Sequence, residues 1–189
     1  MTNTVYLFRH GQTTYNRDKM FTGWKDAKLT RQGVTQAKGI AKQLKGKNID
    51  VAIQTRLSRS KDTLKEVLRY HPECKRIITD DRMIERSYGA LAGKKHSTIT
   101  KKYGEAQYEK WHRGFSDRPP KGESFADVEK RVRKFIKHLK EYVRKHRVDV
   151  AVSAHGNSIR LFRRVMEGLS VSKTKAINIP YDRVYKYRF

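Results

Sequence analysis

The alternation of short apolar runs with longer segments of helical periodicity is the feature that most constrains the fold of this chain. Runs typical of strands lie at Val5–Phe8, Ile49–Gln54, Arg76–Thr79, Val148–Ser153 and Val184–Phe189, and helical spacing is found at 31–46, 58–70, 125–145 and about 158–167. Strands that alternate with helices predict an α/β domain. We expect a three-layer α/β/α sandwich with a mostly parallel central sheet, and the length fits a single domain, 1–189.

The segment 125–145 gives the clearest helical pattern. Its apolar residues fall on one stripe, which comprises Phe125, Val128, Val132, Phe135, Ile136, Leu139 and Val143. Ser124 and Asp127 have the spacing of a capping box, and Thr30 is placed to cap the helix predicted at 31–46. These residues predict where two helices begin and which face of the longest one is buried.

The chain carries a large excess of positive charge. Lys and Arg number 44 against 19 Asp and Glu, which gives a formal net charge of +25. Such a balance fits a polyanionic partner, or an anionic substrate attracted by the protein's field. Because the basic residues are spread from Arg9 to Arg188 with no separate arm, we expect solvated helix faces and at most non-specific contact with nucleic acid.

The sequence shows neither an apolar run of signal-peptide length at its start nor the roughly 20 apolar residues of a membrane span. Its single cysteine, Cys74, cannot form an internal disulfide, which fits a reducing compartment. We therefore expect a cytoplasmic protein without a membrane partner.

Two of the apolar runs lead into the same dipeptide, His-Gly. His10-Gly11 follows the run at 5–8, and His155-Gly156 follows the run at 148–153. In open α/β sheets, ligands bind beyond the carboxyl ends of the strands. We therefore expect both histidines at the ligand-binding edge of the sheet, although they lie far apart in the sequence.

The tripeptide Arg9-His10-Gly11 has the residue types that phosphoryl transfer needs. An unprotonated histidine nitrogen can attack phosphorus, and an adjacent arginine can bind the equatorial oxygens with paired donors. The glycine lets the backbone come close to the anion, while Thr13 and Asn16 supply neutral donors in the next element. From these residues alone, a structural His-Gly remains the alternative.

Three further residues could complete such a site. Arg59 lies near the start of the helix predicted at 58–70 and could bind the anion, or it could be a solvated residue. His155 could donate to the phosphoryl oxygens, or serve as a core or capping histidine. Glu85 could move the proton of the leaving oxygen, or be an ordinary surface carboxylate.

Together these segments resemble the histidine phosphatase superfamily, and within it the cofactor-dependent phosphoglycerate mutase branch, from about Val5 to Pro180. The resemblance to the superfamily is carried by Arg9-His10-Gly11, Arg59 and His155-Gly156-Asn157, in this order. Segments similar to the mutase branch are Phe21-Thr22-Gly23-Trp24, Glu85-Arg86-Ser87-Tyr88-Gly89 and Asn178-Ile179-Pro180.

The resemblance implies a role for each matching residue. It makes His10 the phosphohistidine, surrounds the phosphoryl group with Arg9, Arg59 and His155, and makes Glu85 the general acid and base. It assigns the substrate contacts to Thr13, Asn16, Thr22, Gly23, Tyr88, Lys95, His96, Arg113, Gly156 and Asn157. It also implies a small anionic phosphate ester as substrate, 2,3-bisphosphoglycerate as phosphoryl primer, no metal, and a monomer or homodimer.

The chain departs from the mutase branch at the far end of the expected pocket. His96 stands where a lysine is usual, and His112 takes the place of the first of two arginines. The tail that closes over many mutase sites has no counterpart after Phe189, and a more open site would favour hydrolysis. If His96 and His112 bind the second anion, the ratio of mutase to phosphatase activity should rise as the pH falls from about 8 towards 6.

These observations leave three functions open. The expected one is interconversion of 2- and 3-phosphoglycerate through a phosphohistidine, favoured by the mutase-like segments. The first alternative is a histidine-type phosphomonoesterase, favoured by the two histidines at the far end. The second alternative is a basic nucleic-acid-binding or regulatory protein on the same scaffold, which a strong salt dependence of DNA binding would indicate.

Overall fold

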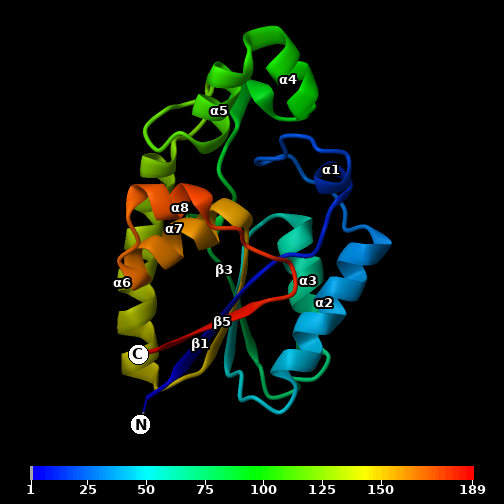
Figure 1. The fold of residues 1–189 in the computed structure, drawn as a ribbon. Coiled ribbons are helices and arrows are strands. Elements are labelled where there is room, and N and C mark those ends of the chain that lie inside the picture. Colours follow the sequence, from blue (N-terminus) through cyan, green and yellow to red (C-terminus); the bar gives the residue numbers. More distant parts are fainter. Residues whose placement is uncertain (1) are drawn as a thin grey trace.

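A five-stranded sheet forms the centre of the molecule in the computed structural model, which describes residues 2–189 (Figure 1). Its strands are β1 (Thr4–Arg9), β2 (Val51–Gln54), β3 (Arg76–Thr79), β4 (Val150–Ala154) and β5 (Val184–Arg188). The strand order is β3-β2-β4-β1-β5, and only β5, at one edge, runs antiparallel to its neighbour. The expected mostly parallel sheet is therefore confirmed.

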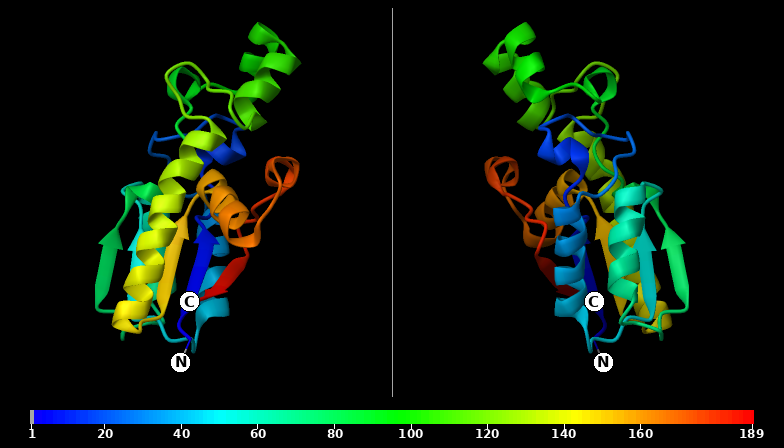
Figure 2. Two further views of the ribbon diagram at one scale, coloured as in Figure 1. Left: turned by 90° about the vertical axis from the view of Figure 1, so that its left-hand side faces the viewer. Right: turned by 90° about the vertical axis from the view of Figure 1, so that its right-hand side faces the viewer.

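Helices cover both faces of this sheet. The long helix α6 (Phe125–His146) and α7 (Gly156–Glu167) pack on one face, and α2 (Arg31–Leu44) and α3 (Ser58–Leu68) pack on the other (Figures 1 and 2). Side chains alternate along a strand, and in β1 Val5 and Leu7 join the core under α6 and α7, while Tyr6 and Phe8 join the core under α2 and α3. The three-layer sandwich follows from this alternation and is confirmed.

Shorter helices lie beyond the carboxyl ends of the parallel strands. They are α1 (Thr14–Arg17), α4 (His96–Tyr103), α5 (Glu105–Arg113) and α8 (Val171–Ala176), with 3-10 turns η1 (Asp81–Met83) and η2 (Gly89–Leu91). Helices α4 and α5 form a small lobe at the top of Figure 1, with a separate apolar cluster around Phe21, Leu91 and Ile99. Among the helices that the structure describes, none has the length and apolar character needed to cross a bilayer.

The starts predicted for α2 and α6 from their capping residues agree with the structure. All seven stripe residues of α6 are buried, and Ser124 and Asp127 form the expected capping box. Thr30 caps α2 by accepting a hydrogen bond from the amide of Gly33. Helix α7 begins at Gly156 rather than at Ser158, so its first turn follows β4 directly and its amino end faces the edge of the sheet.

A glycine is needed at position 11 because the backbone of Gly33 packs directly against it. We had expected this glycine to let the backbone approach an anion, and the structure gives it this packing contact instead. A Cβ on Gly11 would lie 2.1 Å from the carbonyl oxygen of Gly33, and a Cβ on Gly33 would lie 2.0 Å from the carbonyl oxygen of Gln12. The amide of Gly11 already donates to the Thr63 hydroxyl, at 3.0 Å. These contacts fix the chain after His10 against α2 and α3.

We expect Gly33→Ala to lower the free energy of unfolding by about 1–3 kcal/mol, because the added methyl group would force apart two backbone segments. Gly39 lies in the same helix and has nothing within 4 Å of its Cβ position, so it provides a matched control. Gly39→Ala should raise the free energy of unfolding by about 0.5–1 kcal/mol through helix propensity. Urea unfolding measures both, and an equal effect of the two substitutions would contradict the packing argument.

Candidate active site

The pairing of β1 with β4 brings the two His-Gly dipeptides together. The register places Arg9 opposite Ala154, and the amide of His10 donates to the carbonyl oxygen of Ala154 at 3.0 Å. The imidazole rings of His10 and His155 are 5.0 Å apart between centroids, and both side chains are buried. The structure therefore places both histidines at one edge of the sheet, as the sequence predicted.

The neutral His10 ring has a defined tautomer. Its Nδ1 lies 2.7 Å from the carbonyl oxygen of Gly11, which can only accept a hydrogen bond. Nδ1 therefore carries the proton, and the lone pair of Nε2 is free. Burial, and then the positive charges of Arg59 and Arg9, hold the pKa of His10 well below its usual range. The ring is thus neutral at neutral pH, and its Nε2 lone pair has the form that attack on phosphorus requires.

Backbone carbonyls hold the two arginines in place. The guanidinium of Arg9 donates from Nη1 to the carbonyl of Ile179, at 2.8 Å. Arg59 donates from Nη1 to Lys25 and from Nη2 to Gly23, at 2.9 and 2.7 Å. Burial lowers the pKa of Arg59 to about 10, so the group stays charged at neutral pH. These hydrogen bonds from Arg9 and Arg59 thus go to neutral carbonyl oxygens and not to carboxylates.

Four buried polar groups near His10 have no hydrogen-bond partner among residues 2–189. They are Nε of Arg9, Nε of Arg59, Nδ1 of His155 and the hydroxyl of Thr22. Buried donors in native proteins are almost always satisfied, and guanidinium groups bind phosphoryl oxygens especially well. A phosphoryl dianion beside Nε2 of His10 is the ligand that this set of donors fits.

His155 can act as one of these donors in one of its tautomers. Its Nε2 lies 2.8 Å from the Thr55 hydroxyl, and if that hydroxyl donates, the imidazole proton is on Nδ1. Burial, and then the charge of Arg59, hold the pKa of His155 well below its usual range. The amino end of α7 follows immediately at Gly156, and its helix dipole also favours an anion.

Glu85 lies next to both histidines. Its Oε1 accepts hydrogen bonds from the amides of Arg86 and Asn157, at 2.7 and 3.2 Å. His10, Glu85 and His155 each offer a possible metal-ligand atom, and these atoms lie within 4.8 Å of one another. The charges of Arg9 and Arg59 would repel a cation here, so an anion-binding site without metal remains our prediction.

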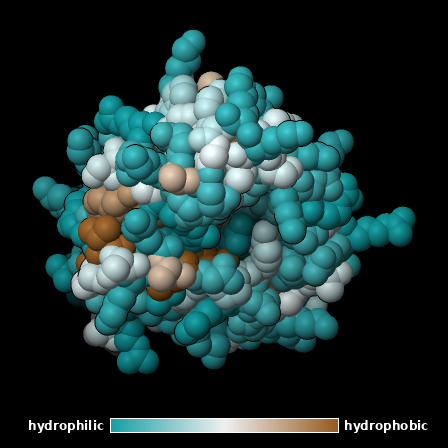
Figure 3. Space-filling model, turned by 45° about the horizontal axis from the view of Figure 1, so that its top comes forward, coloured by the Kyte–Doolittle hydropathy of each residue, from teal (hydrophilic) through white to brown (hydrophobic). Residues whose placement is uncertain are grey.

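A cavity of about 160 Å³ adjoins this cluster. Figure 3 shows a hollow near the centre of the strand-end face, which is mostly hydrophilic. The volume is below the several hundred cubic ångströms typical of drug-sized ligands, so it suits a small molecule. Its lining includes most of the sequence-predicted residues, namely Arg9, Asn16, Thr22, Gly23, Glu85, Tyr88, His96, Arg113, Gly156 and Asn157.

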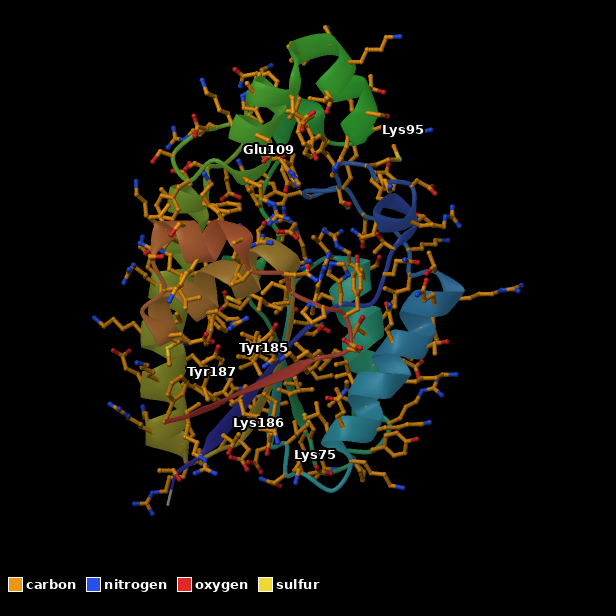
Figure 4. The ribbon with its side chains drawn as sticks, in the orientation of Figure 1. Lys75, Lys95, Glu109, Tyr185, Lys186 and Tyr187 are labelled. Carbon is orange, nitrogen blue, oxygen red and sulfur yellow. The ribbon has the colours of Figure 1, made fainter. Side chains whose placement is uncertain are left out.

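Two of the predicted substrate contacts do not line the cavity. Thr13 is buried as the N-cap of α1, where its hydroxyl is bonded to the Asn16 side chain. Lys95 is the N-cap of α4, with an exposed side chain at the outer edge of the molecule (Figure 4). Thr13 was expected as a neutral donor and Lys95 as a substrate contact implied by the resemblance, and the local structure gives both residues N-cap positions instead.

The far wall of the cavity contains neutral histidines beside two arginines. Burial, and then the charge of Arg113, lower the pKa of His112 to about 3, and burial also lowers the pKa of His96. His112 therefore stays neutral as the pH falls towards 6 in the ligand-free protein, contrary to our expectation, and the lowered pKa of His96 makes its protonation smaller than expected. Arg160 lines the same wall and was missed from the sequence; its pKa is lowered by burial to about 9.

Comparison with known proteins identifies the class to which this arrangement belongs. The family model of the histidine phosphatase superfamily (branch 1) matches residues 5–189. The chain therefore belongs to this superfamily.

Similar proteins of this superfamily include phosphoglycerate mutases and a phosphatase. A 2,3-bisphosphoglycerate-dependent phosphoglycerate mutase from Bartonella henselae is 35% identical over 188 residues, covering 95% of this chain and 91% of the relative. The structure of a mycobacterial glucosyl-3-phosphoglycerate phosphatase is similar with a TM-score of 0.80 and 25% identity, covering 94% of this chain and 85% of that one. A phosphoglycerate mutase from Bacillus anthracis has the same fold, with a TM-score of 0.82, 22% identity and coverage of 100% and 88%. The chain is therefore an enzyme of a group that holds both mutases and phosphatases.

We expect Arg59→Lys to weaken the binding of inorganic vanadate or phosphate by roughly 10- to 100-fold, because a lysine cannot reproduce the Nε donor or the two carbonyl contacts. Arg56→Lys is the matched control, since Arg56 lies three positions earlier, exposed and paired with Asp81. Titration calorimetry on both variants measures the effect. Equal anion affinity in the two variants would remove Arg59 from the site.

Proposed function

We propose that the chain is a 2,3-bisphosphoglycerate-dependent phosphoglycerate mutase, which interconverts 2- and 3-phosphoglycerate through a phosphohistidine at His10. The observation that carries this proposal is the set of four buried polar groups around a histidine whose Nε2 is free. The relative from Bartonella henselae has this activity in its name. The cavity of about 160 Å³ also fits a three-carbon phosphate ester.

With His10 phosphorylated, a hydroxyl group of the bound phosphoglycerate attacks phosphorus as the bond from phosphorus to Nε2 breaks. In the return step, Nε2 attacks the other phosphoryl group as the bond from that phosphorus to its ester oxygen breaks. Arg9, Arg59 and His155 stabilise the charge on the equatorial oxygens. Glu85 takes the proton of the attacking hydroxyl group and gives a proton to the leaving ester oxygen in the return step. The Oε1 atom of Glu85 is held by two backbone amides, so Oε2 is the oxygen available for this transfer.

The residues at both ends of the cavity also have the charge and the donors that a bisphosphorylated primer needs. The buried donors near His10 would bind one phosphoryl group, and Arg113 and Arg160 on the far wall would bind the other. When bound, 2,3-bisphosphoglycerate would supply the phosphoryl group that loads His10. Asn157, whose side-chain amide donates to the Tyr88 hydroxyl at 3.2 Å, lies between these two ends and would contact the glycerate.

A phosphatase is the second candidate, and one specific observation favours it. His96 and His112 are neutral, so the far wall holds fewer cations than the lysine and arginine usual in the mutase branch would give it. A weakly held phosphoglycerate would leave before it takes the phosphoryl group from His10, and water would then take that group instead. The same buried cluster serves both reactions, so only activity distinguishes them.

The test is to incubate the protein with each phosphoglycerate, with and without 2,3-bisphosphoglycerate, and to follow isomer exchange against phosphate release. We expect exchange that depends on the bisphosphate, with some release, and label on His10 that is acid-labile. A His10→Ala variant should take up no label. Phosphate release without isomer exchange would replace the mutase with the phosphatase, and labelling of His10→Ala at the wild-type level would refute the phosphohistidine assignment.

Glu85→Gln should lower kcat by roughly 10²–10⁴-fold on an alkyl phosphate, because the alkoxide leaving group then lacks its proton donor. With p-nitrophenyl phosphate, whose leaving group needs no proton, kcat for formation of the phosphohistidine should change far less. This pair of substrates is its own control for correct folding. If both rates fall equally, or neither falls, Glu85 does not transfer the proton.

A further inference from the structure

The loop between α8 and β5 crosses the carboxyl-end edge of the sheet close to the site (Figure 1). It is fixed on both sides of Tyr181. Ile179 is buried in the core and accepts the Arg9 hydrogen bond, and the carbonyl of Asp182 accepts a hydrogen bond from the side chain of Gln43 at 2.8 Å. Tyr181 is therefore held in a defined position over the site.

Tyr181 covers one face of the Arg9 guanidinium. The Cζ atom of Arg9 lies 4.0 Å from the centroid of the Tyr181 ring, which is the geometry of a cation–π contact. Gly156 lies against the same guanidinium, since a Cβ on Gly156 would be 3.4 Å from Cζ. The Nη1 group of Arg9 donates its hydrogen bond to the carbonyl of Ile179. With these contacts made, Nε of Arg9 is still without a hydrogen-bond partner among residues 2–189.

The same ring lies near His10. The ring centroids are 6.5 Å apart, and the Tyr181 side chain is half-buried whereas His10 is buried. The Tyr181 ring therefore covers Arg9 on one side and is partly exposed to solvent on the other. A phosphoryl group on His10 would lie beside this ring and the Arg9 guanidinium.

We propose that Tyr181 is a positioning residue that holds Arg9 in its anion-binding orientation and shields phosphorylated His10 from water. The inference rests on the proposed phosphohistidine. Water and a glycerate hydroxyl compete for the same phosphorus: in either case an oxygen–phosphorus bond forms, the bond from phosphorus to Nε2 breaks, and Glu85 takes the proton. Tyr181 thus sets the ratio of phosphate release to isomer exchange.

The test compares Tyr181→Ala, Tyr181→Leu and Tyr181→Phe in the full-length protein. Tyr70→Ala is the matched control, because Tyr70 is an exposed tyrosine whose ring lies 5.5 Å from Lys45 in another cation–π contact. Each protein is loaded with labelled phosphate from 2,3-bisphosphoglycerate, freed of ligand, and followed for the half-life of the label. Vanadate affinity and the ratio of phosphate release to isomer exchange are measured in parallel.

We expect Tyr181→Ala to shorten the half-life of the label and to weaken vanadate binding, each by roughly three- to tenfold. Tyr181→Leu should restore much of the half-life, because it excludes water, but not the vanadate affinity. Tyr181→Phe should match the wild type in both measurements, and so should Tyr70→Ala. Among these variants, those with a shorter half-life of the label should show a higher ratio of phosphate release to isomer exchange.

Several results would overturn the inference. An unchanged half-life and vanadate affinity in Tyr181→Ala would do so, and so would a Tyr181→Phe variant as impaired as Tyr181→Ala, since the hydroxyl rather than the ring would then matter. A wild-type protein that takes up no label would refute the proposed function instead. The vanadate measurement needs no phosphohistidine, so in that case it still decides whether Tyr181 positions Arg9.

Discussion

The burial of guanidinium groups on backbone carbonyls is the interaction on which the rest of this structure depends. Arg9 and Arg59 donate to carbonyls of loops that come from distant parts of the chain, and Arg160 donates to the carbonyl of Ile177. A carbonyl contributes a dipole but no net charge, so these hydrogen bonds reduce the cost of burial without neutralising the cation. The loops are ordered around positive charges that remain available to an anion.

The same arrangement explains how two neutral histidines coexist with these cations. Burial disfavours protonation, and nearby positive charges add to this effect, so His10 and His155 both have lowered pKa values. A free imidazole in water would be partly protonated near neutral pH, and its protonated fraction has no lone pair for attack. The arginines thus have two effects, because the charge that favours an anion in this place also helps to keep the imidazole of His10 unprotonated. The overall charge of +25 extends the attraction for anions over the whole surface.

Strong local patterns made much of this architecture predictable. The stripe of α6 and the runs of β1 and β4 identified the layers, and the two His-Gly dipeptides identified the edge of the sheet where the site lies. Helices α4 and α5 were not predicted, because each is short and packs on a small local cluster. Arg160 was missed for a different reason. Residues 156–162 of α7 are all buried, so the first two turns have no exposed face from which the direction of a side chain could be read.

The buried cluster is common to transfer and hydrolysis, so the far wall of the cavity decides between them. A mutase must bind a phosphoryl group at either end, because the phosphoglycerate keeps its own phosphoryl group while its other hydroxyl receives the one from His10. Arg113 and Arg160 line that wall, and two guanidinium charges balance a phosphoryl dianion even while His96 and His112 stay neutral. The Tyr108 hydroxyl, 3.0 Å from Nδ1 of His96, keeps that imidazole in a hydrogen-bonded and fixed position. The departures from the usual lysine and arginine therefore reduce the charge of the far wall without removing its capacity for a second anion, and this supports the mutase over the phosphatase.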